Sequence, residues 1–362
     1  MQSTIPTTPQ TGLVAWFKEN RGLLTLLIFM MLLPFLLALL DGKSISSVLS
    51  NETGNSRFMQ GLLIEVFVLA IFAISYDLVL GITGLLSFGH AMFFAVGAYT
   101  TGIMIKSFGW GIVPTLGAVL LAGVVNALLF GLVLPRVKGI TFALVTLGLA
   151  AVFEIIVKST ELQKYTGADV GLQGVVIPDW INTSSERFRL YLVALFITFF
   201  VYLLYRRFVD SPTGRVCIAI RENENRALML GYNTFYFKLV ALIVSAMTAA
   251  LAGFLHTIHQ PIVSPTVAGL GYTVAALLMI LMGGIGTLSG AMIGAAVFRL
   301  LSFYLERWFS ESASFLLGAV YIVLVMFIPY GIVGTWRLRK LDIQRGRERL
   351  VRLLTGRVIR NR

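Results

Sequence analysis

The chain has 362 residues, of which 57% are hydrophobic and only 13% are charged, and its mean hydropathy is +0.86. This composition excludes a soluble globular protein and indicates a polytopic membrane protein. The net charge of +12 does not indicate nucleic-acid binding, because the Lys and Arg residues lie in loops and the tail, where positive-inside topology accounts for them. The single cysteine, Cys217, excludes an intrachain disulfide.

The first apolar run, 23–40, follows Lys18 and Arg21 and so has the flanks of a signal peptide. It is longer than the apolar core of a signal peptide, about 7 to 15 residues, and no small-x-small cleavage pattern follows it. We therefore expect an uncleaved first span with a kink at Pro34, preceded by a cytoplasmic segment, 1–22.

Nine further apolar runs follow, separated by turn or charged residues. They lie at roughly 60–80, 85–105, 112–134, 140–158, 190–206, 238–258, 268–283, 288–305 and 314–335. Because lipid offers no partner to backbone N–H and C=O groups, continuous runs of about 20 residues predict helices, whereas barrel strands would alternate. The predicted fold is an all-α polytopic membrane protein with about ten transmembrane helices in one domain, 23–335.

Orientation follows from the basic loops. Lys and Arg are in excess in three segments, which we predict to be cytoplasmic: 135–139, 206–238 and the tail 336–362. The loops predicted for the outer face lack this excess: 41–58, 158–189 and 306–312. An even number of spans then places both termini in the cytoplasm. The tail also suits an amphipathic helix on anionic membrane lipid, although orientation charge alone explains its arginines.

Residues 214–231 form the one markedly polar island between two long apolar blocks, inside a cytoplasmic segment over 207–237. A membrane protein with such a polar segment on one face, and without a nucleotide-binding motif of its own, is expected to receive mechanical work there from a soluble partner. The alternative is an ordinary solvated connection between two spans.

Local signals predict the structure of this island. Residues 211–214 (SPTG) predict a turn, and 218–230 predict one short helix of about 20 Å. Glu222 and Arg226 have the spacing of an i,i+4 pair, and Gly231 suits the C-cap.

The glycine-rich segment 283–290 does not have the sequence of a phosphate-binding loop. Ala291 and Met292 follow it where a Walker loop needs Lys and then Ser or Thr, and Ser289 stands where a dinucleotide loop needs Gly. We expect a helix break there instead, with its free backbone groups facing protein or a polar path.

Two further patterns concern helix packing. The tetrapeptides GLLS at 84–87 and GTLS at 286–289 are a weak internal echo, which indicates either two parallel halves or chance similarity. Small residues at four-residue spacing, such as Gly123 and Ala127, predict close approach of helix backbones.

Ionisable residues inside spans are costly and therefore informative. There are five: Glu65, Asp77, His90, Glu154 and Arg299. All but His90 are expected near an interface, whereas His90 is the best candidate for a polar group lining a translocation path, with an interhelical hydrogen bond as the alternative. The candidate path residues are Ser87, Gly89, His90, Gly283, Gly284, Gly286 and Ser289.

His256 and His259 stand three residues apart, as in a metal-binding pair. Neither the spacing nor the neighbouring sequence supplies a third ligand, so we expect no metal and no other cofactor.

Three ordered motifs resemble one family. The segments 77–99 (DLVLGITGLLSFGHAMFFAVGAY), 219–233 (AIRENENRALMLGYN) and 283–290 (GGIGTLSG) are similar to the membrane permease subunit of bacterial branched-chain amino acid ABC importers. The resemblance extends over roughly 60–335. Related permeases serve urea and short amides, and the broader group includes sugar permeases.

The resemblance implies a subunit of the bacterial plasma membrane that has no catalytic residues. Its implied partners are a second homologous permease, two cytoplasmic ATPases and an extracytoplasmic solute-binding protein. The polar island would be the coupling segment, and these residues would engage the ATPase: Arg215, Arg221, Glu222, Asn223, Glu224, Arg226, Ala227 and Gly231.

Two rival functions remain. A stand-alone secondary transporter or channel would need ion-coupling charges near the bilayer midplane, and few charges are placed there. A membrane-embedded enzyme would have to use His90, His256 or His259.

Overall fold

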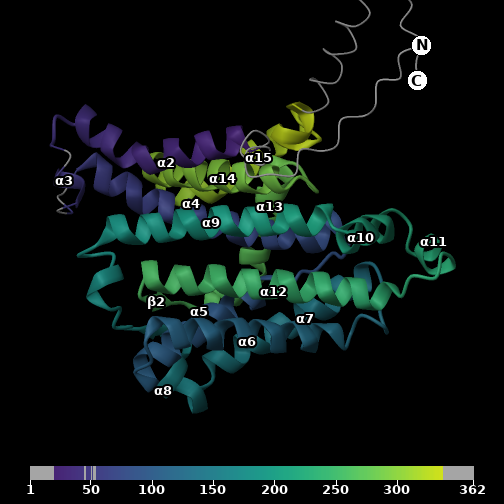
Figure 1. Cartoon of the computed structure of the whole chain (residues 1–362). Coiled ribbons are helices and arrows are strands. Elements are labelled where there is room, and N and C mark those ends of the chain that lie inside the picture. The colour runs from purple at the N-terminus through teal and green to yellow at the C-terminus, as the bar shows by residue number, and fades with distance from the viewer. Residues whose placement is uncertain (1–19, 45, 50, 52–53, 337–362) are drawn as a thin grey trace, which may run out of the picture.

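The computed structural model describes residues 20–44, 46–49, 51 and 54–336 (Figure 1). Most of the predicted amino-terminal segment, 1–22, and nearly all of the predicted basic tail lie outside the described residues. The cytoplasmic location of both, and the contact of the tail with lipid, stay predictions.

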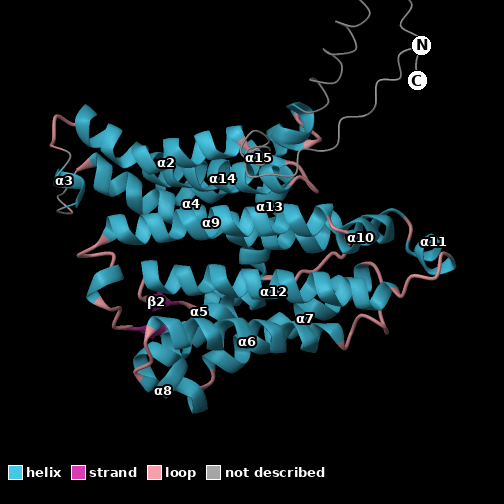
Figure 2. Ribbon diagram, viewed as in Figure 1, coloured by secondary structure: helices cyan, strands magenta, loops and turns pink. Residues whose placement is uncertain are grey.

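The described residues form a helical bundle, in which most of the long helices run along one common direction (Figures 1 and 2). These long helices are α2 (Arg21–Leu40), α4 (Asn55–Asp77), α5 (Ala91–Phe108), α6 (Ile112–Gly131), α7 (Ile140–Lys158), α9 (Arg187–Asp210), α12 (Thr234–His259), α13 (Leu270–Gly283), α14 (Leu288–Phe309) and α15 (Ala313–Phe327).

Among the described residues, 8 helical stretches are long and apolar enough to cross a membrane. The last of them, Leu288–Trp336, contains both α14 and α15, and the apolar helix α13 is shorter. Each of the ten predicted spans thus coincides with one long helix, and the predicted all-α fold of a polytopic membrane protein is confirmed.

The predicted start of the third span, residue 85, is wrong, because α5 begins at Ala91. Helix α4 continues into a π-helical turn, Leu78–Ile82, and the chain then reverses at Gly84, whose φ is +77°. A left-handed residue ends a helix, and glycine adopts it without steric cost. The apolar residues after Gly84 therefore form a turn rather than the beginning of a helix.

Short elements lie at the two ends of the bundle (Figure 1). One end carries α10 (Pro212–Glu222) and α11 (Glu224–Met229), and we call it the α10–α11 end. The other carries α3 (Ser46–Leu49), α8 (Gln163–Thr166) and an antiparallel pair of strands, β1 (Leu172–Gln173) and β2 (Ile262–Val263), and we call it the β1–β2 end. Five 3₁₀ turns lie between these elements: Thr160–Leu162, Ala168–Val170, Asp179–Ile181, Pro265–Ala268 and Ser310–Ser312. Residues 331–336 are also helical.

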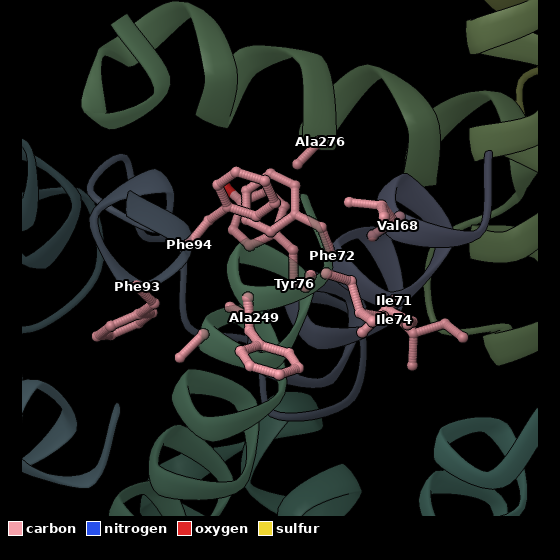
Figure 3. Close-up of a cluster of buried hydrophobic side chains, with 14 of the residues drawn as sticks. Val68, Ile71, Phe72, Ile74, Tyr76, Phe93, Phe94, Ala249 and Ala276 are labelled. Carbon is pink, nitrogen blue, oxygen red and sulfur yellow. The ribbon is translucent and has the colours of Figure 1, made fainter. Parts of the chain in front are cut away.

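Helix α4 lies at the centre of the bundle. In its most apolar window 89% of the residues are buried, against 11% for α2, so α4 packs on all sides and α2 is peripheral. Figure 3 shows the cluster around it, with these labelled side chains: Val68, Ile71, Phe72, Ile74, Tyr76, Phe93, Phe94, Ala249 and Ala276. Because lipid is as apolar as these side chains, close packing rather than the hydrophobic effect holds such helices together.

Small residues permit the closest of these contacts. A Cβ atom on Gly97 of α5 would lie 2.1 Å from the carbonyl oxygen of Ala250, and one on Gly253 of α12 would lie 2.1 Å from that of Phe94. Gly123 of α6 approaches the backbone of α12 in the same way, at 3.0 Å. The prediction of close helix approach at small residues is confirmed at these positions.

Candidate functional site

The polar island forms an arm at the α10–α11 end. Ser211 caps α10, since its hydroxyl accepts a hydrogen bond from the Gly214 N–H at 3.2 Å and Pro212 follows at the first helical position. At Asn223 the backbone becomes extended, and the Asn223 side chain accepts from the Arg226 N–H at 2.9 Å to begin α11.

The prediction of one continuous helix over 218–230 is therefore wrong. The physical reason is that the Asn223 side chain caps a new helix instead of continuing the old one. The break removes Glu222 and Arg226 from helical i,i+4 register.

The end of α11 is as predicted. Gly231 has a φ of +86°, its N–H donates to the Leu228 carbonyl at 3.0 Å, and the Tyr232 N–H donates to the Ala227 carbonyl at 3.2 Å. These two bonds form a Schellman motif, which satisfies carbonyl groups that a helix end leaves free.

Glu224 fastens α11 to the bundle. Its carboxylate accepts from Lys238 Nζ at 2.6 Å and from the Thr234 hydroxyl at 3.1 Å, both in the first turns of α12. Burial raises the pKa of Glu224, but the hydrogen bond and charge of Lys238, together with the Thr234 hydroxyl, outweigh burial and hold the pKa below its usual value. Glu224 is thus ionised at neutral pH and bound within its own chain.

The arm presents a mixed surface. Six of the residues predicted to engage an ATPase are exposed, namely Arg215, Arg221, Glu222, Asn223, Arg226 and Gly231, whereas Ala227 is buried. Met229 and Leu230 are 87% and 70% exposed beside them. A shallow groove of about 640 Å³ lies along α10, lined in part by Arg215, Leu230 and Tyr232. Exposed charges next to apolar side chains are typical of a docking surface, and the predicted roles of the individual residues stay predictions.

Cys217 lies on the opposite, buried face of α10. Burial raises the pKa of its thiol to about 11, so the thiol is neutral, and its sulfur lies 3.7 Å from the carbonyl oxygen of Phe237 in α12. This residue packs the arm against the bundle.

Arg221 joins the arm to two turns at the same end of the bundle. Its guanidinium Nη1 donates to the carbonyl oxygen of Gly81, in the π-helical turn after α4. Its aliphatic part covers Gly84, where an added Cβ would lie 3.0 Å from Arg221 Cγ, and its Nη1 would lie 2.7 Å from a Cβ on Gly286. The two turns that carry the GLLS and GTLS echo thus lie side by side under one arginine.

Asp77 also links the same two turns. Its Oδ1 accepts from the Gly286 N–H at 2.7 Å, and its side chain is fully buried at the end of α4. The predicted location of Asp77 near the inner interface did not indicate this bond. The buried Asp77 carboxylate has one hydrogen bond and lies close to the Arg221 charge. A small shift of either turn would therefore disturb its interactions.

The candidate path residues fall into two places. Gly283 ends α13, Ser289 lies in the first turn of α14, and Gly284 and Gly286 lie in the turn between these helices, with φ values of +120° and +73°. This confirms the predicted helix break.

Ser87, Gly89 and His90 lie instead in the core between α4 and α5. His90 is fully buried, its Nε2 lies 2.9 Å from the Ser75 hydroxyl, and its ring packs on Tyr76 at 4.7 Å between centroids. This is the interhelical hydrogen bond that the sequence left open as the alternative, and a role of His90 in a path stays a prediction.

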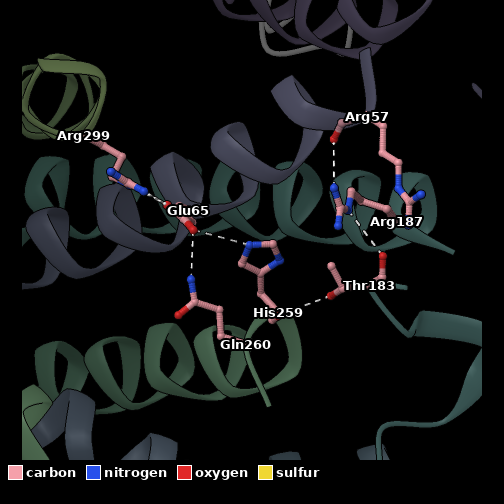
Figure 4. A network of polar contacts seen from close by, with 7 residues as sticks. All are labelled: Arg57, Glu65, Thr183, Arg187, His259, Gln260 and Arg299. Atoms are coloured by element: carbon pink, nitrogen blue, oxygen red, sulfur yellow. Dashed lines mark hydrogen bonds and ion pairs between the residues drawn. The ribbon is translucent and has the colours of Figure 1, made fainter. Parts of the chain in front are cut away.

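One polar network was missed by sequence reasoning (Figure 4). Arg299 of α14 forms an ion pair with Glu65 of α4, and Gln260 donates to Glu65 at 2.9 Å. His259 Nε2 lies 3.7 Å from the same carboxylate, whereas the ring of His256 packs on an aromatic ring of α5. The available signal was the presence of opposite charges inside two spans, since such charges pair.

Comparison with known proteins identifies the family. Residues 58–326 match the family described as "Branched-chain amino acid transport system / permease component". The chain belongs to this family. It is a multi-pass membrane permease component rather than an enzyme.

Several relatives are permease proteins of named transport systems. The chain is 29% identical over 295 residues to the high-affinity branched-chain amino acid transport system permease protein LivM of Salmonella typhimurium, covering 74% of this chain and 68% of the relative. It is 28% identical over 298 residues to LivH of Escherichia coli, covering 75% and 92%, and 23% identical over 297 residues to BraD of Pseudomonas aeruginosa, covering 75% and 93%. No solved structure matches the chain.

Proposed function

We propose that this chain is the membrane-spanning permease subunit of an ATP-driven importer for branched-chain or related amino acids. The family match over 58–326 and relatives named for branched-chain amino acid transport support the class and the substrate. The observation that carries the mechanism is the position of Arg221, which contacts the turns after α4 and before α14 at once.

The proposed mechanism is a switch between two arrangements of the bundle. Closure of cytoplasmic ATPases moves the arm, 211–231, and Arg221 transmits the movement to the two glycine turns. The helices joined at those turns then alternate between an outward-open and an inward-open arrangement. ATP hydrolysis drives the transport cycle because it changes which arrangement the partners bind, and no chemistry takes place on the substrate.

The proposal requires partners. Relatives named LivM and LivH are permease proteins of one named transport system, which supports a second, homologous permease beside this chain. We further infer two ATPases docked on the α10–α11 end, in the cytoplasm, and a solute-binding protein at the β1–β2 end. Urea or a short amide is the alternative substrate class.

Reconstitution tests this function. The complete complex of two permeases and two ATPases is placed in liposomes, with the binding protein on the side of the β1–β2 end, and uptake of labelled leucine is measured with and without ATP. We expect uptake that needs ATP, both ATPases and the binding protein, and that excess isoleucine inhibits but urea does not. Leucine uptake by the isolated chain without ATP would overturn the proposal in favour of a secondary transporter.

A further inference from the structure

A cavity of about 200 Å³ lies inside this single subunit, between four of its helices. Its lining residues come from α4, α12 and the residue that follows it, α13 and α14: Glu65, Val68, Leu69, Phe72, His256, His259, Gln260, Tyr272, Ala275, Met279, Phe298 and Arg299. Its volume is several times what one water molecule requires, so the space suits a small solute. None of these residues belongs to the arm or to the two glycine turns.

One end of the cavity is charged and faces the β1–β2 end. Arg299 Nε donates to Glu65 Oε2 at 2.5 Å and Arg299 Nη2 contacts the same oxygen, while Gln260 Nε2 donates to Oε1 at 2.9 Å (Figure 4). The Glu65 and Arg299 side chains are 21% and 22% exposed, so both charges remain accessible. The buried His259 Nδ1 has no hydrogen-bond partner among the described residues.

The other end of the cavity is apolar. Val68 and Phe72 line it from α4, and Ala275 and Met279 line it from α13. Phe72 lies seven positions along α4 from Glu65, which is about 10 Å at the helical rise. The cavity therefore changes from a pair of opposite charges to an aliphatic and aromatic wall over about the length of one small amino acid.

We propose that this cavity binds the transported solute as a zwitterionic α-amino acid with a branched apolar side chain. This inference rests on the proposed function and gives it a site. The ligand's ammonium group donates hydrogen bonds to the Glu65 carboxylate. Its own carboxylate accepts from those N–H groups of Arg299 that do not bond to Glu65, and its side chain fills the apolar end.

Charge balance favours a zwitterion over other solutes. A zwitterion adds one positive and one negative charge to an existing ion pair, so the net charge inside the membrane stays zero, whereas a singly charged solute would bring an uncompensated charge into a poorly solvated place. A neutral amide such as urea would leave both charges without a ligand counterpart and the apolar end unfilled.

The experiment measures leucine and alanine on the same preparations. Equilibrium binding of labelled amino acid is measured on the complete permease–ATPase complex without the binding protein, at concentrations up to the millimolar range. ATP-dependent uptake by the same complex in liposomes, with the binding protein present, tests the proposed function separately. The variants are Glu65→Gln, Ala275→Leu and, as the matched control, Glu154→Gln, which removes a carboxylate paired with Lys158 at 2.7 Å outside the cavity.

We expect Glu65→Gln to weaken the binding of both amino acids at least about tenfold, because it removes the partner of the ammonium group. Ala275→Leu fills the apolar end and should weaken leucine binding at least about tenfold, while alanine binding changes no more than about twofold. Retained alanine binding shows that this variant is folded. Glu154→Gln should bind both as the unaltered complex does.

Two results would overturn the inference alone. They are the lack of saturable leucine binding by a complex that transports leucine, and unaltered leucine binding by both Glu65→Gln and Ala275→Leu. Lack of ATP-dependent uptake by the unaltered complex would instead overturn the proposed function.

Discussion

Replacing Arg221 by alanine should uncouple ATP hydrolysis from transport. Arg221 is the side chain of the arm that donates to Gly81, covers Gly84 and approaches Gly286. The variant keeps α10 and removes only the contacts that this side chain makes with the two turns. The bond between Asp77 and the Gly286 N–H remains in the variant and continues to hold the turns to each other. Movement of the arm is then transmitted less effectively to the ends of α4 and α14.

The magnitude follows from the contact that is lost. A hydrogen bond from a charged donor contributes about 1.5 to 3 kcal/mol, and the lower value applies here because Arg221 is exposed to solvent. Since about 1.4 kcal/mol is a factor of ten in an equilibrium constant, the arm should be engaged with the turns about ten times less often. Arg221→Lys keeps the charge but not the planar donor geometry, and its effect should be intermediate.

The assay compares basal ATP hydrolysis, amino-acid-stimulated hydrolysis and uptake in the reconstituted complex. We expect stimulated hydrolysis and uptake to fall about tenfold in Arg221→Ala, while basal hydrolysis and complex assembly are retained. The matched control is Arg189→Ala, which removes an arginine paired with Glu186 at 3.3 Å on the surface near the β1–β2 end. Full stimulation and uptake by an assembled Arg221→Ala complex would refute the coupling role.

Three further predictions concern packing and the arm. Gly253→Ala should lower the free energy of unfolding by at least about 2 kcal/mol, since its Cβ would meet a carbonyl oxygen of α5 at 2.1 Å. The control Gly148→Ala, whose Cβ would have no atom within 4 Å, should be neutral or stabilising. Thermal unfolding in detergent measures both. Gly286→Ala forces a side chain into a left-handed conformation, at about 1 to 2 kcal/mol, and should lower stimulated hydrolysis. Folding lowers the pKa of Glu224, so its bond to Lys238 stabilises the folded chain fully above the unfolded pKa of about 4.3, and this stabilisation is lost as pH falls through the folded pKa. Glu224→Gln should therefore lower the free energy of unfolding by about 1 kcal/mol at pH 7 and by less at pH 4. An equal loss of stability at both pH values would contradict this assignment.

Helix positions could be predicted because the membrane imposes a minimum length of apolar sequence on every span. The same rule explains the error at residue 85, since apolar content does not distinguish a helix from the apolar turn at Gly84. The break at Asn223 had a usable local signal, because asparagine is a preferred helix N-cap and the acidic Glu224 follows it.

The contacts between distant residues could not be predicted in this way. Glu65 and Arg299 are 234 positions apart, and their pairing depends on which faces of α4 and α14 meet. Arg221 carries the charge expected of a docking residue, and only the folded chain brings it onto the turn that contains Gly81. The sequence of one chain shows which residues are charged, but it does not show which of them lie close together in the folded chain.

The arm and the cavity are connected through the same pair of helices. Helix α4 carries Glu65 near its middle and Asp77 at its end, about 18 Å apart along its axis. Glu65 bonds to Arg299 of α14, and Asp77 bonds to Gly286 in the turn before α14. Moving the turn against α4 at the α10–α11 end must therefore strain or shift the ion pair at the cavity, because packed helices move as stiff units. Linkage then requires the reverse effect: an amino acid that binds between Glu65 and Arg299 biases the position of the arm by the same free energy.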